Sequence, residues 1–189
     1  LPTMRAMKKA AKIYLFGLAL ITVAAVVTLL VLPNDWQAGG SVEIKAPAPK
    51  VHPYVNSLKN WQRWAIGDIK AEDPDAEITF SGPETGVGAT MSWSSETMGR
   101  GHYTITRSDP GEGVWYEAAL QGDEVNSHGH FTYVKTADGT RVTWFEDGAL
   151  PGVLGGLQAG PVGDAMTKLH EDRLAKLKAL AEGEQSLKP

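Results

Sequence analysis

Residues 101–120 read GHYTITRSDPGEGVWYEAAL, and this stretch decides the fold. Apolar and polar side chains alternate on both sides of its centre, which is the period of a β-strand with one buried face. The central Asp109-Pro-Gly111 has the residue types of a tight turn. The stretch therefore predicts two strands that pair as an antiparallel hairpin.

The same alternation continues along the chain on either side of this hairpin. Residues 78–80 alternate and end at Ser81-Gly-Pro83, a turn signal. From residue 88 onward, five closely spaced strands follow one another, and Asp138-Gly139 has the composition of a hairpin turn. Strands joined by such short connections predict an antiparallel meander that curls.

Helical patterns lie before and after this meander. A strand at residues 42–45 runs into a helix in two pieces over residues 50–64, and a long helix is predicted over residues 163–182. The connection 150–162 holds two prolines and four glycines, and we expect a mobile lid or gate there. The apolar faces of the sheet and of the last helix are both buried if the sheet wraps around that helix. The predicted class is therefore α+β, with a cavity or a packed core between the sheet and the helix.

The N-terminal part carries a run without charge over residues 13–32. A helix of that length spans roughly 30 Å, the thickness of a bilayer's hydrocarbon core. Arg5, Lys8, Lys9 and Lys12 precede the run, while Asp35 is the first charge after it. The positive-inside rule therefore predicts a cytoplasmic basic tail over residues 1–12 and export of everything after the helix.

A secretory signal peptide that is cleaved off is one alternative, and a buried core helix is another. The run is longer than the usual apolar stretch of a signal peptide and lacks an A-x-A site at its end. A core helix would normally carry polar positions. We therefore expect a retained single-pass anchor in a bacterial inner membrane, a linker over residues 33–41 with Trp36 at the membrane interface, a periplasmic domain over 42–182, and a tail over 183–189.

Composition excludes several classes of function. Of the 18 Lys and Arg residues four precede the apolar run, so 14 remain in the exported part against 22 Asp and Glu. This acidic balance argues against a nucleic-acid partner, because phosphate binding needs a basic face. The absence of cysteine excludes disulfides, thiol catalysis and cysteine-ligated zinc. We predict no cofactor and no metal.

Four short motifs occur in order in the exported part: VEIKAPAPKV at 42–51, LKNWQRW at 58–64, FSGP at 80–83 with GVG at 86–88, and GTRVTW at 139–144. Together they resemble the helix-grip (SRPBCC) superfamily of START lipid-transfer domains, Bet v 1 allergens and polyketide cyclase/dehydrase-like proteins. The resemblance covers roughly residues 41–181. It implies a hydrophobic cavity under the C-terminal helix, but no single activity, since the fold hosts carriers, hormone binders, cyclases and hydroxylase subunits.

Bulky, largely apolar side chains are predicted to point inward from the strands and helices. They either fill a core or line a pocket for an apolar ligand, for which tyrosine and tryptophan offer contact area with a polar tip. Sterol, hopanoid, fatty acyl or polyaromatic molecules would suit such a pocket. The predicted pocket residues are Trp64, Met91, Trp93, Tyr103, Ile105, Tyr116, Phe131, Tyr133, Trp144, Met166 and Leu169.

Glu146 is the candidate for catalysis. It follows Val142 and Trp144 at even spacing, so its side chain is placed to enter the cavity, where burial would raise the pKa of the carboxyl and suit it to acid or base chemistry. The alternative is that the strand has already ended and Glu146 meets solvent near Asp147-Gly148.

Histidines supply a second set of candidates. His128 and His130 share one strand face, and His102 or Glu117 on a neighbouring strand would complete a metal site. The alternative, a solvent-facing pair, agrees better with Phe131 and Tyr133 on the opposite face. His52 and His170 occupy polar helix positions and are predicted to lie on the surface.

Three functions from different classes follow. The first is a membrane-tethered domain that holds a hydrophobic small molecule or lipid and moves lipid within the periplasm. The second is an enzyme of cyclase or isomerase type that uses Glu146 or a tyrosine in the same cavity. The third is a non-enzymatic interaction module, with a filled interior, beside a membrane complex.

Overall fold

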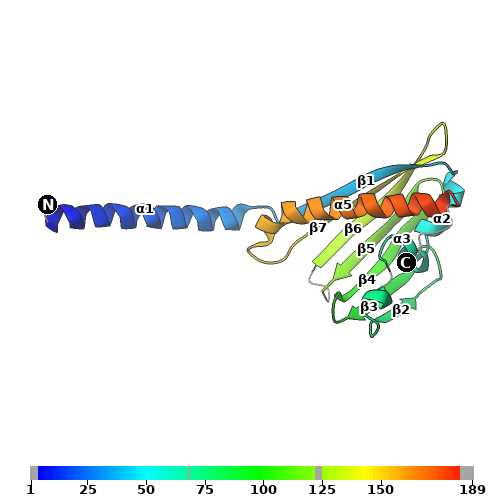
Figure 1. Ribbon diagram of the computed structural model, residues 1–189, viewed down its shortest axis with the longest axis horizontal. Helices are drawn as coiled ribbons and strands as arrows, with labels where there is room; N and C mark the ends of the chain where they lie inside the picture. Colours follow the sequence, from blue (N-terminus) through cyan, green and yellow to red (C-terminus); the bar gives the residue numbers. More distant parts are fainter. Residues whose placement is uncertain (1–3, 68, 122–124, 184–189) are drawn as a thin grey trace.

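The computed structural model describes residues 4–67, 69–121 and 125–183. A long helix projects from an α+β domain built on one seven-stranded antiparallel sheet, with strand order β1-β7-β6-β5-β4-β3-β2 (Figure 1). Parts of the two predicted tails, residues 1–3 and 184–189, lie outside the described residues. The elements are α1 Met4–Val31, β1 Asp35–Ile44, α2 Ala48–Val55, α3 Leu58–Trp64, α4 Ile69–Glu72, β2 Glu77–Ser81, β3 Thr90–Ser95, β4 Gly99–Asp109, β5 Gly113–Leu120, β6 Val125–Lys135, β7 Thr140–Ala149 and α5 Gly155–Ala181.

The central hairpin is confirmed as β4 and β5. Ile105 pairs with Tyr116, and the Oδ1 of Asp109 accepts the backbone N–H of Gly111 at 2.7 Å in the turn. Gly113 follows with φ 144°, where an added Cβ would lie 1.8 Å from the carbonyl oxygen of Phe131. Only glycine fits this position. The same residue therefore permits both the backbone conformation of the turn and the close approach of β6.

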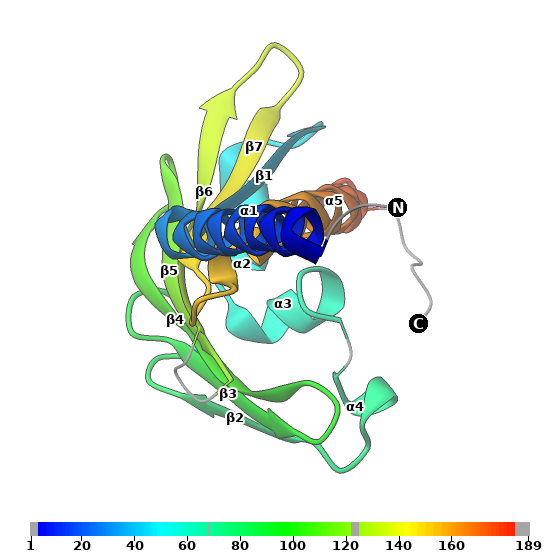
Figure 2. The same ribbon diagram turned by 90° about the vertical axis from the view of Figure 1, so that its left-hand side faces the viewer.

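The sheet curls around its helices, as predicted. Viewed along α1, it forms a half-open trough whose concave face is turned toward α3 and α5 (Figure 2). Helix α5 lies along the β1 and β7 side of the trough, and α3 faces the β3 side. This is the curved antiparallel sheet with a long C-terminal helix that was predicted, and it places the interior between α3, α5 and the middle strands.

The predicted linker over residues 33–41 is wrong from Asp35 onward. Those residues belong to β1 and pair with β7, from Asp35 opposite Ala149 to Ser41 opposite Thr143. Gly40 permits close packing of this strand on α5, because a Cβ there would lie 3.3 Å from Cγ of Glu171. Trp36, predicted at the membrane interface, is only 5% exposed and packs with Ala38 and Ala159.

The predicted lid over residues 150–162 is wrong as well, since α5 begins at Gly155 rather than at Gly163. Pro161 lies inside the helix, a position that normally argues against one. Close contacts hold this helix at two glycines: a Cβ on Gly156 would lie 2.5 Å from the Cβ of Leu32, and one on Gly163 would lie 2.7 Å from the carbonyl oxygen of Gln37 in β1. Packing of α5 against β1 thus overrides the local preference of this segment for a loop.

Helix α1 contains one segment long and apolar enough to cross a membrane, Lys12–Val31, with mean hydropathy 2.5 and none of that window buried against the rest of the protein. The alternative of a buried core helix is therefore wrong. An anchor and a signal sequence both agree with this finding.

Candidate functional site

Most of the predicted pocket residues do lie on the concave side of the sheet. Tyr103 and Met166 are partly buried. Leu169 is a correction: it is 37% exposed, because it lies about 100° around α5 from the buried His170, at the border of the buried face. The buried members are Trp64, Met91, Trp93, Ile105, Tyr116, Phe131, Tyr133 and Trp144.

Aromatic rings occupy the space between α3 and the middle strands. Trp61 of α3, which the site prediction missed, lies at their centre: its ring centroid is 5.0 Å from Tyr116, 5.5 Å from Tyr103 and 5.6 Å from Phe131. Trp64 extends the cluster to Trp144 at 5.9 Å. The alternative of a filled core therefore applies to this part of the interior. Trp61 belongs to the LKNWQRW motif, so the sequence did carry a signal for it.

A polar cluster lies beside these rings, under α5. Glu146 is only 4% exposed, and its carboxylate accepts hydrogen bonds from Ser127 Oγ at 2.7 Å, Tyr116 Oη at 2.9 Å and His170 Nε2 at 3.1 Å. The Nε1–H of Trp144 donates to the Tyr116 hydroxyl at 2.8 Å. Glu146 thus points inward, and the alternative that it meets solvent is wrong. We call Glu146, His170, Tyr116 and Ser127 the buried polar cluster.

His170 is a correction to the sequence prediction, which placed it on the surface. It is fully buried and stacks on Trp144, with ring centroids 3.8 Å apart. Its Nδ1 has no hydrogen-bond partner within the part of the chain that the structure describes. The missed signal was spacing: His170 precedes Leu174 and Leu177 by one and two helical turns, on the same buried face of α5.

Two partly buried groups, Tyr103 and Arg173, flank the buried polar cluster. Burial raises the pKa of the Tyr103 and Tyr116 phenols above their usual value, and the negative charge of Glu146 raises both further. Both tyrosines are therefore neutral hydrogen-bond donors at physiological pH. Burial lowers the pKa of the Arg173 guanidinium, while Tyr103 and Glu146 favour its charged form. The cluster can orient a hydroxyl or carbonyl group, and its paired carboxylate and imidazole can exchange a proton.

His128 and His130 share the face of β6 opposite to that of Phe131 and Tyr133. His130 packs between the rings of Trp115, at 6.2 Å, and Phe145, at 5.4 Å, and His128 is exposed opposite Glu117. Across the described ranges no group of three or more His, Asp or Glu side chains is arranged to hold a metal ion.

His52 is a further correction. It was predicted on the surface but is only 8% exposed, with Nδ1 3.4 Å from the Tyr133 hydroxyl and Nε2 3.3 Å from that of Ser108. Burial lowers the pKa of its imidazole, and the negative charge of Asp109 acts in the opposite direction.

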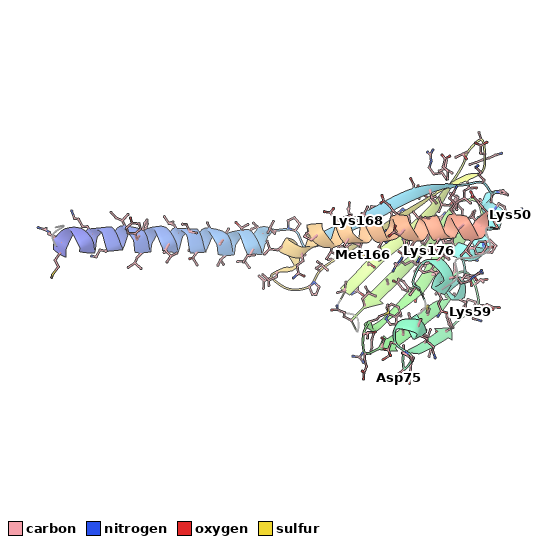
Figure 3. The ribbon with its side chains drawn as sticks, in the orientation of Figure 1. Lys50, Lys59, Asp75, Met166, Lys168 and Lys176 are labelled. Atoms are coloured by element: carbon pink, nitrogen blue, oxygen red, sulfur yellow. The ribbon has the colours of Figure 1, made fainter. Side chains whose placement is uncertain are left out.

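Several hollows lie at the rim of the domain, and two of them lie near turns of the sheet. One, of about 850 Å³, has polar walls that include Asp75 and Arg100 near the β3–β4 turn, and Figure 3 labels Asp75 at that end of the molecule. The other, of about 420 Å³, lies between the start of α2 and the β6–β7 turn and is bordered by Tyr133. Neither includes a member of the buried polar cluster.

Comparison with known proteins identifies the family. A sequence profile described as "Polyketide cyclase / dehydrase and lipid transport" matches residues 36–182. The match covers most of the chain, so the protein belongs to this family. It begins within β1, in agreement with the strand that replaces the predicted linker. No curated protein matches the sequence.

Solved structures share the fold at low sequence identity. Protein SA2116 of unknown function from Staphylococcus aureus has a TM-score of 0.61 and 10% identity, and the alignment covers 78% of this chain and 94% of that one. The di-domain ARO/CYC StfQ from the steffimycin biosynthetic pathway has a TM-score of 0.59 at 10% identity, covering 78% of this chain and 51% of that one. The di-domain ARO/CYC BexL from the BE-7585A pathway has 0.57 at 14% identity, covering 83% and 53%. At these identities the likeness establishes the helix-grip fold alone.

Proposed function

We propose that this protein is a membrane-anchored domain that binds a hydrophobic small molecule or lipid, with a polar group of the ligand held by the buried polar cluster. Family membership supports the ligand class, since the family description names lipid transport together with cyclases. The ligand site lies between α5 and the middle strands, with Tyr103 and Arg173 at its border.

The buried polar cluster is the observation that carries this proposal. A buried nitrogen without a partner costs free energy, and among the described residues the Nδ1 of His170 has no hydrogen-bond partner while Nε2 faces Glu146. Small-molecule sites combine apolar walls with a few polar groups that fix the ligand's orientation. A ligand hydroxyl that donates to Nδ1 would satisfy the histidine. Tyr103, stacked on Trp93 at 5.3 Å and partly exposed, is the side chain we expect to swing aside on entry.

The membrane anchor rests on α1. Its apolar window is unburied and follows a basic N-terminal segment, which supports a membrane span. The positive-inside rule favours a domain on the far side of the inner membrane. In bacterial cells, we expect the intact chain to stay in the membrane after an alkaline wash. Its domain should be cleaved by protease added to spheroplasts. Release of a shortened, soluble chain would instead indicate a cleaved signal.

The ligand is tested by organic extraction and mass spectrometry of the detergent-purified full chain. We expect about one apolar molecule per chain in the wild type, enriched over bulk membrane lipid, and its loss in His170→Phe. Lys168→Ala is the matched control, because Lys168 is exposed on the same helix. Extracts that hold only bulk lipid in all three proteins would contradict ligand binding and favour an interaction module with a packed interior.

A second candidate function, acid–base catalysis on the bound molecule, is favoured by the Glu146–His170 hydrogen bond. A carboxylate and an imidazole within such a distance can relay a proton to a substrate carbonyl or hydroxyl, which typically contributes about 100-fold or more to rate. Glu146→Gln should then lower turnover of the extracted ligand by that factor. Unchanged turnover in Glu146→Gln and Tyr116→Phe would exclude this chemistry.

A further inference from the structure

Three apolar side chains stand in solvent where the chain passes from β7 into α5. Val153 is 60% exposed, Leu154 55% and Leu157 53%. We call them the apolar tip. They lie within a run, residues 148–163, that contains no charged residue, although the domain as a whole is acidic. Exposed apolar groups that gather in one place commonly mark a surface that another molecule covers.

The apolar tip is held against the end of α1. The Nδ2 of Asn34 donates to the carbonyl oxygen of Gly152 at 3.3 Å, and the backbone N–H of Leu150 donates to the carbonyl oxygen of Asn34 at 3.1 Å. A Cβ on Gly156 would lie 2.5 Å from the Cβ of Leu32, so glycine permits direct contact between α5 and the last residue of the apolar run. In Figure 1 this loop and the start of α5, in orange, form the part of the domain nearest to α1.

These contacts fix the depth of the tip relative to the proposed membrane span. If Leu32 ends the hydrocarbon-spanning segment, the side chains that pack beside it lie at the headgroup boundary, where leucine and valine are favoured over solvent exposure. The absence of charge over 148–163 removes both the repulsion between carboxylates and anionic lipids and the cost of burying a charge. A bilayer surface is therefore the partner that fits this face.

We propose that Val153, Leu154 and Leu157 insert into the interface of the membrane that α1 spans. They give the domain a second lipid contact and hold the start of α5 against the bilayer. This inference rests on the proposed membrane anchor. It adds a docking surface that fixes the orientation of the domain, so that one end of the trough faces the lipid.

The experiment uses the natural absence of cysteine from the chain. Single variants Leu154→Cys and Leu157→Cys of the full chain are labelled with an environment-sensitive fluorophore and reconstituted into phosphatidylcholine vesicles. Quenching by lipids that carry a nitroxide near the headgroup is then measured. Val134→Cys is the control on β6, since Val134 is also apolar and 55% exposed, and Ile21→Cys reports on α1.

We expect probes at 154 and 157 to be quenched about twofold more than the probe at 134, with a blue-shifted emission. Two results together would overturn this inference without contradicting the anchor: equal quenching at 154, 157 and 134, and quenching of the probe at 21 by a nitroxide deep in the acyl chains. A protein partner would then be the molecule that covers the apolar tip. An unquenched probe at 21 would contradict the anchor itself. Because all four side chains are exposed, the substitutions should leave the circular dichroism of the domain unchanged.

Discussion

Glu146 accepts hydrogen bonds from side chains on three other elements, β5, β6 and α5, and so ties the sheet to the helix that covers it. Removing the carboxylate leaves three buried donors without an acceptor. We expect Glu146→Ala to lower the free energy of unfolding by about 3 kcal/mol in urea denaturation. Glu43→Ala is the matched control: Glu43 pairs with Arg141 on the surface, and its loss should cost less than about 1 kcal/mol. Equal costs would contradict a structural role for the cluster.

Gly129 leaves the room that Tyr116 needs to reach Glu146. A Cβ at position 129 would lie 2.1 Å from Cζ of the Tyr116 ring. Gly129→Ala should therefore displace the ring, lower the free energy of unfolding by about 1–3 kcal/mol and change the near-ultraviolet circular dichroism. In the turn, a Cβ at Gly111 would meet only Oδ1 of Asp109 at 3.4 Å, so Gly111→Ala should leave both measurements near the wild type. A stable Gly129→Ala protein with an unchanged spectrum would rule out this packing.

His52 should make stability depend on pH. Burial lowers the pKa of the folded imidazole below its ordinary value of about 6.5, so just below that pH the unfolded chain binds more protons at this position than the folded chain does. The stabilisation is present above 6.5 and declines as the pH falls below it. We expect the free energy of unfolding to fall less steeply between pH 7 and 5 in His52→Gln than in the wild type. Identical slopes in the two proteins would contradict this assignment.

The site was only partly predictable because its members do not share one pattern. Alternation along β7 correctly indicated that Glu146 enters the interior beside Trp144. His170 was missed because a histidine in a charged stretch of helix reads as a surface residue unless its turn-by-turn spacing from Leu174 and Leu177 is weighed. The hydrogen-bond partners of Glu146 lie on other elements, and a single sequence does not show which elements contact each other.

At the scale of elements, α5 offers a matched pair of glycines in one helix. A Cβ at Gly163 would lie 2.7 Å from the carbonyl oxygen of Gln37, whereas at Gly160 nothing lies within 4 Å. We expect Gly163→Ala to destabilise the domain by about 1–3 kcal/mol by pushing α5 from β1. Gly160→Ala should change the stability by less than about 1 kcal/mol, because the preference of alanine for a helix interior is offset by the ring of Pro161, which disfavours a Cβ on the preceding helical residue. Thermal unfolding measures both, and equal costs for the two variants would contradict the packing.

The elements that the sequence predicted well are those whose structure is decided locally. The β4–β5 hairpin was correct because its alternation and its turn residues agree locally. The starts of β1 and α5 were missed because glycine and proline are ordinarily read as breaks, and here Gly40 and Gly163 are small so that the two elements can touch. Their secondary structure is decided by each other, across more than a hundred residues of chain, and no local pattern records that.

At the scale of the whole molecule, α1 and the domain meet through few residues. The apolar window of α1 is unburied, so removing residues 1–32 takes little from the core. We expect a chain of residues 33–189 to fold with a free energy of unfolding within about 1 kcal/mol of that of the full chain in detergent. The truncated chain should also bind to vesicles weakly through the apolar tip. A molten, unstable domain would show that α1 is part of the folding unit.

The short connection between α1 and β1 limits the distance that the domain can move away from α1. Only residues 32–34 separate the two elements, a reach of at most about 10 Å even when fully extended. If α1 is the membrane anchor that we propose, a domain held on so short a connection cannot carry cargo across a compartment. Its ligand would then have to arrive and leave within a thin layer above the bilayer, by lateral encounter with neighbouring membrane components.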